Sequence, residues 1–183
     1  VVKVVKSTEI NAKAGDVTSE KKVKDTNDTT GKTTDWQDSA DHDIGDKIPF
    51  QLKMTVPGNF AQFNTYGEAY KFVFHDTEEQ GLSFNNDAKV YVNGTEITSD
   101  FEVVFPTAHK EDDDTFDVVF ADLTKIPDLK AGDVITVEYT STLTESAVLG
   151  KQGNINTVYG EYSNLHRPEY PGFTPKDSVI AFT

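Results

Sequence analysis

The segment KIPFQLKMTVP, residues 47–57, alternates apolar and polar side chains along its length. The apolar residues occupy every second position: Ile48, Phe50, Leu52, Met54 and Val56. Successive residues of a β-strand point to opposite faces of a sheet, so this spacing predicts an antiparallel strand with one buried face. Pro49 is compatible with that prediction because it lies near the start of the strand.

Strand character continues through the rest of the chain. Period-two or continuous apolar patterns predict strands at 17–24, 68–77, 101–105, 116–123, 133–144, 154–163 and 179–183. The pair Asn93-Gly94 within AKVYVNGTEI predicts a two-residue hairpin turn. Helix signals are confined to AQFNTYGEA and ADLTKIPDL, each long enough for a turn or two. Many short strands separated by turn residues predict an all-β fold, with the immunoglobulin-like β-sandwich as its form.

The composition supports one β-rich domain and restricts its partners. The 183 residues include 12 Phe and 7 Tyr, which suits an aromatic core. The formal net charge of −14 argues against nucleic acid or anionic lipid as a partner, and no segment resembles a transmembrane span. Cysteine is absent, so disulfides cannot stabilise the fold. We expect residues 1–16 to be a leader or a linker from a preceding domain, and residues 17–183 to form the domain itself.

Residues 25–47 are almost all polar and predict a surface loop with an acidic cluster. The cluster consists of Asp35, Asp38, Asp41, Asp43 and Asp46. It could bind Ca²⁺, but it lacks the order of ligands, glycine and terminal glutamate found in an EF-hand, so a solvated loop is the preferred interpretation. Trp36 in this loop is expected to pack over the sandwich. The histidines share no metal-ligand spacing, and the sequence predicts neither a metal nor a cofactor: His42, His75, His109 and His166.

Three polar residues continue the apolar faces of predicted strands: Lys21, Asp76 and Asn156. Each lies an even number of positions from the apolar residues of its strand, as Lys21 does from Val23, and is therefore predicted to face the core. Each alone has an ordinary explanation: a lysine whose end reaches solvent, an aspartate that opens a turn, or an asparagine in a loop. Together they supply an amine, a carboxyl group and a carboxamide.

Four stretches of the sequence carry a resemblance to a known family. They are SEKKVKD, FHDTEEQGLSF, ITVEYTSTLTESAVLG and NINTVYGEYSN. In this order and spacing they resemble the isopeptide-forming second domain of Gram-positive major (backbone) pilins, which is similar to the A-type repeat fold of collagen adhesins. The resemblance covers residues 17–183, nearly the whole chain.

The resemblance implies a role for each of the three polar residues. Lys21 matches the nucleophilic lysine, Asn156 the asparagine whose side chain it attacks, and Asp76 the acid that promotes the resulting isopeptide bond. A lysine amine is a nucleophile only when neutral, and burial favours its neutral form. The same burial keeps an aspartic acid protonated, so that it can polarise the asparagine carbonyl and help ammonia leave.

The sequence leaves an alternative open for each of the three residues. Lys22 and Lys24 are the alternative nucleophiles, and Asn154 is the alternative acceptor. Glu138 is the alternative acid, because related B-type domains use a glutamate on a central strand. However, Glu138 lies on the opposite face of its strand from Tyr139.

The resemblance also implies a biological role. We expect a structural domain of a pilus shaft subunit, in a secreted, cell-wall-anchored fibre, with neighbouring pilin subunits as partners in a covalent polymer. The reaction would occur once per chain, so the domain is not expected to be an enzyme. The alternative is an adhesin module that binds a host protein or glycan. A glycoside hydrolase is a third class, but no pair of carboxylates stands out for it.

Overall fold

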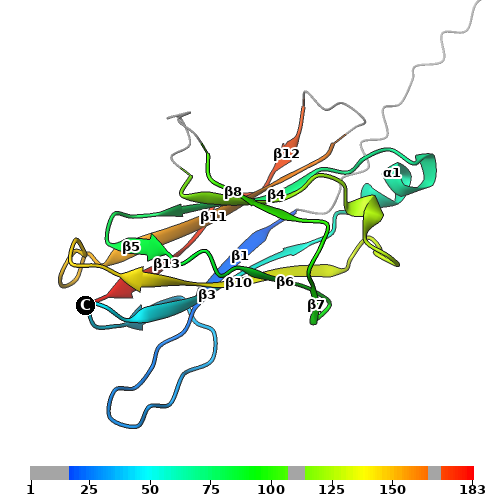
Figure 1. Ribbon diagram of the computed structural model, residues 1–183. Coiled ribbons are helices and arrows are strands. Elements are labelled where there is room, and N and C mark those ends of the chain that lie inside the picture. The colour runs from blue at the N-terminus through cyan, green and yellow to red at the C-terminus, as the bar shows by residue number, and fades with distance from the viewer. Residues whose placement is uncertain (1–16, 107–113, 165–169) are drawn as a thin grey trace, which may run out of the picture.

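The computed structural model describes residues 17–106, 114–164 and 170–183, and these form two β-sheets packed face to face (Figure 1). The predicted leader at 1–16 lies outside the described residues. His109 and His166 also lie outside them.

The first sheet contains six strands in the described part of the chain. Its order is β1 (Ser19–Val23), β3 (Lys47–Thr55), β10 (Val134–Leu143), β6 (Lys89–Val92) and β7 (Thr95–Ile97), with β5 (Leu82–Phe84) also paired to β10. All of these pairs are antiparallel. The long strands β3 and β10 form the centre of this sheet.

The second sheet contains seven strands within the same described ranges. Its order is β2 (Ser39–Asp41), β13 (Asp177–Phe182), β11 (Asn154–Tyr162), β4 (Phe72–Glu78), β9 (Phe116–Phe120) and β8 (Glu102–Val104), with β12 (Gly172–Phe173) also paired to β11. The chain passes repeatedly between the sheets, so strands distant in sequence become neighbours across the core.

Apolar side chains from both sheets fill the space between them. The aromatic and aliphatic residues that are 0% exposed include Phe50, Leu52, Phe72, Phe74, Phe116, Phe120, Ile135 and Val137. Burying each such side chain contributes about 1.5–3 kcal/mol relative to leaving it exposed. The core is therefore the main source of stability, and it also defines the water-free layer in which any inward-facing polar group must lie.

The predicted all-β, immunoglobulin-like sandwich is confirmed. Asn93 and Gly94 join β6 to β7 with φ angles of 47° and 82°, the positive values that a type I′ turn requires. The two weak helix signals correspond to the short helix α1 (Phe60–Tyr66) and the 3₁₀ turn η1 (Leu123–Lys125).

The prediction that residues 25–47 form only a surface loop is wrong in part. Ser39–Asp41 form β2, which pairs in parallel with β13, and Ala40 in its centre is 3% exposed. A three-residue strand with one apolar side chain is too short to show a periodic pattern. Its pairing depends on β13, at the other end of the sequence.

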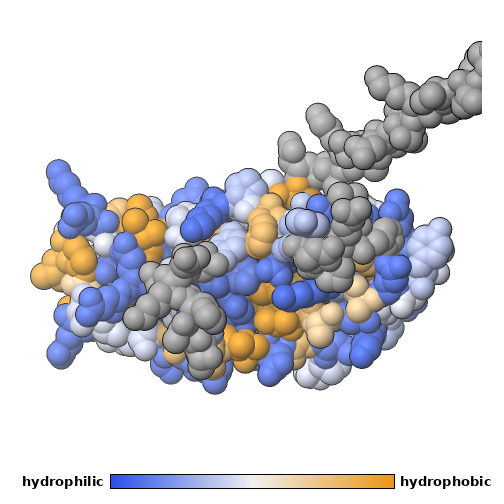
Figure 2. All heavy atoms as spheres, turned by 90° about the horizontal axis from the view of Figure 1, so that it is seen from above, coloured by the Kyte–Doolittle hydropathy of each residue, from blue (hydrophilic) through white to orange (hydrophobic). Residues whose placement is uncertain are grey.

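The face seen in Figure 2 carries mostly hydrophilic residues, with a few exposed apolar groups among them. Figure 2 shows one such group at the left end of the molecule, where the loop between β10 and β11 lies in Figure 1. In that loop Val148 and Leu149 are 41% and 69% exposed. No helix among the described residues has the length and apolar character needed to cross a bilayer.

Candidate functional site

Lys21, Asp76 and Asn156, the three residues predicted to react, lie together between the two sheets. Lys21 comes from β1 in the first sheet, whereas Asp76 and Asn156 come from β4 and β11 in the second. Their exposed fractions are 0%, 0% and 1%. The fold thus brings a lysine into the core beside residues that follow it by 55 and 135 positions.

Strand alternation explains why these side chains point inward. Lys21 lies opposite Leu52 in the register of β1 and β3, two positions before Val23, which is also buried. Asp76 lies two positions after Phe74 on β4 and shares its buried face. The polar groups therefore replace apolar side chains at core positions of otherwise regular strands.

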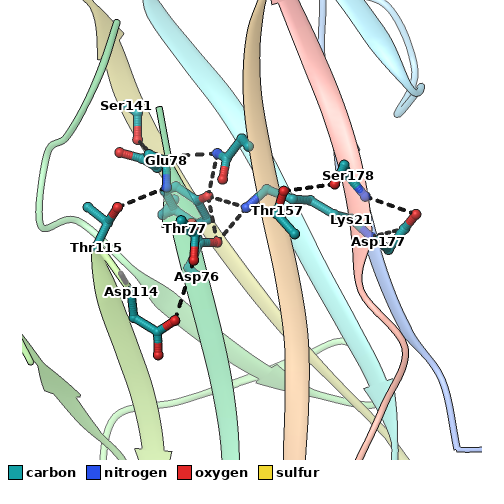
Figure 3. Close-up of polar contacts among 12 residues, drawn as sticks. Lys21, Asp76, Thr77, Glu78, Asp114, Thr115, Ser141, Thr157, Asp177 and Ser178 are labelled. Carbon is teal, nitrogen blue, oxygen red and sulfur yellow. Dashed lines mark hydrogen bonds and ion pairs between the residues drawn. The ribbon is translucent and has the colours of Figure 1, made fainter. Parts of the chain in front are cut away.

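The Lys21 amine and the Asp76 carboxylate form a buried ion pair. Lys21 Nζ lies 2.5 Å from Asp76 Oδ2, and Figure 3 shows the lysine side chain extending from β1 towards β4. The Lys21 backbone N–H donates to Asp177 Oδ2 on β13 at 2.7 Å, which holds β1 against the opposite sheet. Lys21 Nζ also lies 5.5 Å and 5.3 Å from the ring centroids of Phe50 and Tyr139. The amine is therefore enclosed by aromatic rings and one carboxylate.

The hydroxyl group of Tyr139 on β10 contacts all three predicted residues. It accepts hydrogen bonds from Lys21 Nζ and Asn156 Nδ2 and donates one to Asp76 Oδ2, each at 2.8 Å. Sequence reasoning placed Tyr139 on a core-facing position but did not assign it to the site. The signal was available, because a buried tyrosine hydroxyl needs a polar partner.

Glu78 adds a second carboxyl group that sequence reasoning missed. Its Oε1 accepts hydrogen bonds from Ser141 Oγ, as Figure 3 shows, and from Asn156 Nδ2 at 3.4 Å. Glu78 lies two positions after Asp76 on β4, so the same alternation argument identifies it. Glu78 Oε2, Asp76 Oδ1 and Asn156 Oδ1 are all shielded from solvent without a hydrogen-bond partner. A proton on either carboxyl group would turn an unpaired acceptor into a donor.

Burial shifts the ionisable groups of the site towards their neutral forms. Removal from water lowers the pKa of Lys21 and raises the pKa of Asp76, while their mutual attraction opposes both shifts. Burial also raises the pKa of Tyr139 well above its usual value and the pKa of Glu78 to about 7. A neutral amine beside a neutral acid is therefore accessible, and this is the state in which lysine is nucleophilic.

Comparison with solved structures finds similar folds among Gram-positive pilins. BcpA, the major pilin subunit of Bacillus cereus, is 17% identical, with a TM-score of 0.63 over 91% of this chain and 40% of that chain. The pilus backbone protein RrgB of Streptococcus pneumoniae is 22% identical, with a TM-score of 0.58 over 82% and 53%. A C-terminal fragment of the major pilin GBS80 of Streptococcus agalactiae is 20% identical, with a TM-score of 0.63 over 92% and 56%. This chain has the major-pilin fold.

The major-pilin fold confirms, at the level of structure, the resemblance that the four sequence stretches indicated. The chain spans 40% to 56% of the length of these three pilin chains. No family model matches the sequence, and no curated protein matches it.

Within this pilin fold, the alternative nucleophiles lie away from the buried site. Lys22 is on the other face of β1, where its Nζ lies 2.6 Å from Asp38 Oδ1. Lys24 Nζ lies 4.6 Å from the ring centroid of Trp36, which is half-buried. Both amines face the acidic loop, so neither contacts the carboxamide of Asn156.

The alternative acceptor and the alternative acid have other contacts. Asn154 is 0% exposed, but its Oδ1 accepts from Val148 N at 2.9 Å and its Nδ2 donates to Val148 O and Ala181 O at 3.2 Å. It therefore fastens the loop between β10 and β11. Glu138 points away from the core and accepts a hydrogen bond from Gln51 Nε2 at 3.0 Å.

A second polar cluster lies on β4, β9 and β11, together with Asp114 just before β9. His75 Nδ1 is 2.7 Å from Asp114 Oδ2 and 3.0 Å from Asp117 Oδ1, while His75 Nε2 is 3.3 Å from Glu161 Oε1. Burial acts to lower the pKa of His75, but the three hydrogen bonds raise it to about 11. Among the described residues, His75, Asp114 and Asp117 are the one group of three that could hold a metal ion, and the loop at 35–46 assembles none. The raised pKa favours a protonated His75, which opposes metal binding through its Nδ1.

Proposed function

We propose that this domain is a structural unit of a pilus shaft subunit, and that an isopeptide bond between Lys21 and Asn156, promoted by Asp76, stabilises it. The observation that carries the proposal is the 2.5 Å contact between Lys21 Nζ and Asp76 Oδ2 in a site shielded from water. The Asn156 amide is hydrogen-bonded to the same hydroxyl group as the lysine amine. The major-pilin fold supports the shaft role.

The reaction is an amide exchange that releases ammonia. Proton transfer from Lys21 Nζ to Asp76 produces a neutral amine, which attacks Cγ of Asn156. The Nζ–Cγ bond forms, the Cγ–Nδ2 bond breaks, and Nδ2 leaves as ammonia after gaining a proton that Nζ loses. No oxidant or cofactor is consumed. Folding supplies the proximity that makes this otherwise slow reaction possible, and each chain reacts once, so the domain is not an enzyme.

The bond gives the domain resistance to force and to proteolysis. It joins β1 to β11 and closes a loop of 135 residues. By the chain-entropy model developed for disulfides, closing such a loop stabilises a fold by about 5 kcal/mol. An amide link also needs no oxidising environment, which suits a chain without cysteine. These properties support a place in a cell-wall-anchored, extracellular fibre whose neighbouring subunits form a covalent polymer.

An adhesin module remains the alternative to a shaft domain. The same internal bond would serve both roles, because either would be exposed to tension and proteases. The distinction is whether the parent protein is joined covalently to copies of itself. If cell-wall extracts contain a ladder of detergent-resistant multimers of the parent protein, the shaft role is supported. A single cell-wall-linked species would support the adhesin role.

Intact-protein mass spectrometry tests the cross-link. The folded chain should be lighter than its sequence by one ammonia, and a protease digest should yield a branched peptide that joins residues 21 and 156. The variants Lys21→Arg and Asn156→Ala should have their full sequence masses. An unmodified mass for the folded wild-type chain would overturn the proposal.

A further inference from the structure

We propose that Tyr139 is a further catalytic residue of the cross-linking reaction, whose hydroxyl group carries a proton from the lysine nitrogen to the departing amide nitrogen. This inference rests on the proposed function, because it concerns the same reaction. Its basis is the position of the hydroxyl oxygen, which is 2.8 Å from Lys21 Nζ, from Asn156 Nδ2 and from Asp76 Oδ2. The oxygen thus touches the nucleophile, the leaving group and the acid at once.

The ring of Tyr139 is held rigidly in the core. It stacks on Phe50 with a centroid distance of 5.4 Å and an interplanar angle of 24°. It also makes edge contacts with Phe84 and Phe116, at centroid distances of 5.4 Å and 5.0 Å. The residue is 3% exposed. Since the ring cannot move far, the hydroxyl oxygen keeps its place while the hydroxyl hydrogen can rotate between neighbouring acceptors.

The reaction needs a proton to pass between two nitrogens. Once Lys21 Nζ has attacked, it carries one proton more than the product amide retains. Asn156 Nδ2 must gain a proton, because ammonia leaves far more readily than an amide anion. Among the described residues, Asp76 makes no hydrogen bond to Asn156 Nδ2, whereas the Tyr139 hydroxyl contacts both nitrogens. The tyrosine is therefore the direct bridge.

The proton movements balance in three steps. The Lys21 ammonium first gives a proton to Asp76 Oδ2, and this removes the acceptor to which the Tyr139 hydroxyl donates. Attack on Cγ then makes Asn156 Nδ2 pyramidal and gives it a lone pair, towards which the hydroxyl hydrogen can turn. Tyr139 donates that hydrogen to Nδ2 while it accepts one from Nζ. Collapse of the intermediate leaves the isopeptide bond, ammonia, a protonated Asp76 and an intact tyrosine.

The protonation state of Tyr139 suits this role. Burial and the nearby carboxyl groups of Asp76 and Glu78 raise the pKa of Tyr139, so the phenol keeps its proton. A group that both accepts and donates a proton in one step must begin as a neutral hydroxyl. Positioned acid–base groups typically contribute about 10²- to 10⁴-fold to a rate.

The variant Tyr139→Phe tests the relay, because it keeps the packed ring and removes only the hydroxyl group. The full chain would be prepared unfolded in denaturant, diluted into buffer, and sampled over time for ammonia loss by mass spectrometry. We expect cross-linking on the order of 100-fold slower than in the wild type. The matched control is Tyr70→Phe, which removes another buried hydroxyl group, one that donates to Asn59 Oδ1 at 2.7 Å outside the site. This control should react at the wild-type rate.

Wild-type kinetics in Tyr139→Phe would overturn the relay while leaving the cross-link intact. An absence of ammonia loss in the folded wild type would instead overturn the proposed function and the relay with it. Should Tyr139→Phe fail to fold, as judged by circular dichroism, the relay is tested with 3-fluorotyrosine in place of Tyr139 and of no other tyrosine. This analogue preserves the ring and the hydroxyl group but makes the phenol more acidic. A relay predicts a several-fold change in rate, and an unchanged rate with normal folding would overturn it.

Discussion

Lys21 Nζ on β1 lies 2.5 Å from Asp76 Oδ2 on β4, and this contact joins the two sheets through the middle of the core. Removing two charges from water costs several kcal/mol per ion, so an ion pair in this position is a poor way to stabilise a fold. Conversion of the amine to an amide removes its charge, and the carboxyl group can then remain protonated. The arrangement therefore favours the proposed neutral covalent link over a permanent salt bridge.

Replacement of Asp76 tests whether this residue promotes the bond without being one of the two residues that the bond joins. We expect Asp76→Ala to fold without losing ammonia, because both reacting groups remain while the proton acceptor and donor is gone. Glu138→Ala should lose ammonia as fully as the wild type, because Glu138 points away from the core. Intact-mass measurement on both variants checks this. The reverse pattern would transfer the acid role to Glu138.

Substitutions of the two neighbouring asparagines, Asn154 and Asn156, should have different effects. Asn156→Ala is expected to keep the full mass, because it has no carboxamide to attack. Asn154→Ala should still cross-link but be less stable by about 1–3 kcal/mol, because buried hydrogen bonds to Val148 and Ala181 are lost. Thermal unfolding combined with mass spectrometry distinguishes the two effects. An uncross-linked Asn154→Ala that is otherwise folded would contradict the assignment.

Mechanical pulling should reveal which part of the chain is protected. With handles attached at the two ends of the chain, residues between Lys21 and Asn156 lie inside the closed loop, so only the segments outside it can extend. We expect single-molecule traces of the wild type to show only a short extension, from release of β13 and the chain around it. Asp76→Ala should also release the long segment between the two residues.

The same comparison applies to heat and protease. The wild type should resist both better than Asp76→Ala, because the link restricts its unfolded state. In the pulling experiment, equally long extensions of the wild type and Asp76→Ala would show that no covalent link spans β1 and β11.

The His75 cluster predicts a pH dependence that is separate from the cross-link. The folded pKa of His75, about 11, lies above its ordinary value of 6.5, so its charge stabilises the fold. That contribution is complete below pH 6.5 and is lost as the pH rises towards 11. The gap in unfolding temperature between the wild type and His75→Gln should therefore be widest near pH 6 and narrow steadily in alkaline buffer. A gap independent of pH across this range would contradict the ion-pair interpretation.

Much of this molecule follows from local pattern. Period-two alternation depends only on which face of a strand each residue occupies, so it predicted the sandwich and the inward orientation of Lys21, Asp76 and Asn156. The same rule applied two positions beyond Asp76 identifies Glu78. Such patterns are readable because the burial of apolar side chains repeats along each strand.

The sequence did not predict which strands contact each other, and only the tertiary structure shows it. The pairing of β2 with β13 and the approach of Asp114 and Asp117 to His75 are not encoded in any one segment, because each depends on the register between distant strands. The meeting of the Tyr139 hydroxyl with three groups from β1, β4 and β11 is of the same kind. A sequence pattern predicts that a polar group is buried, but only the packing of one sheet on the other determines which atoms it contacts, and the chemistry follows from those contacts.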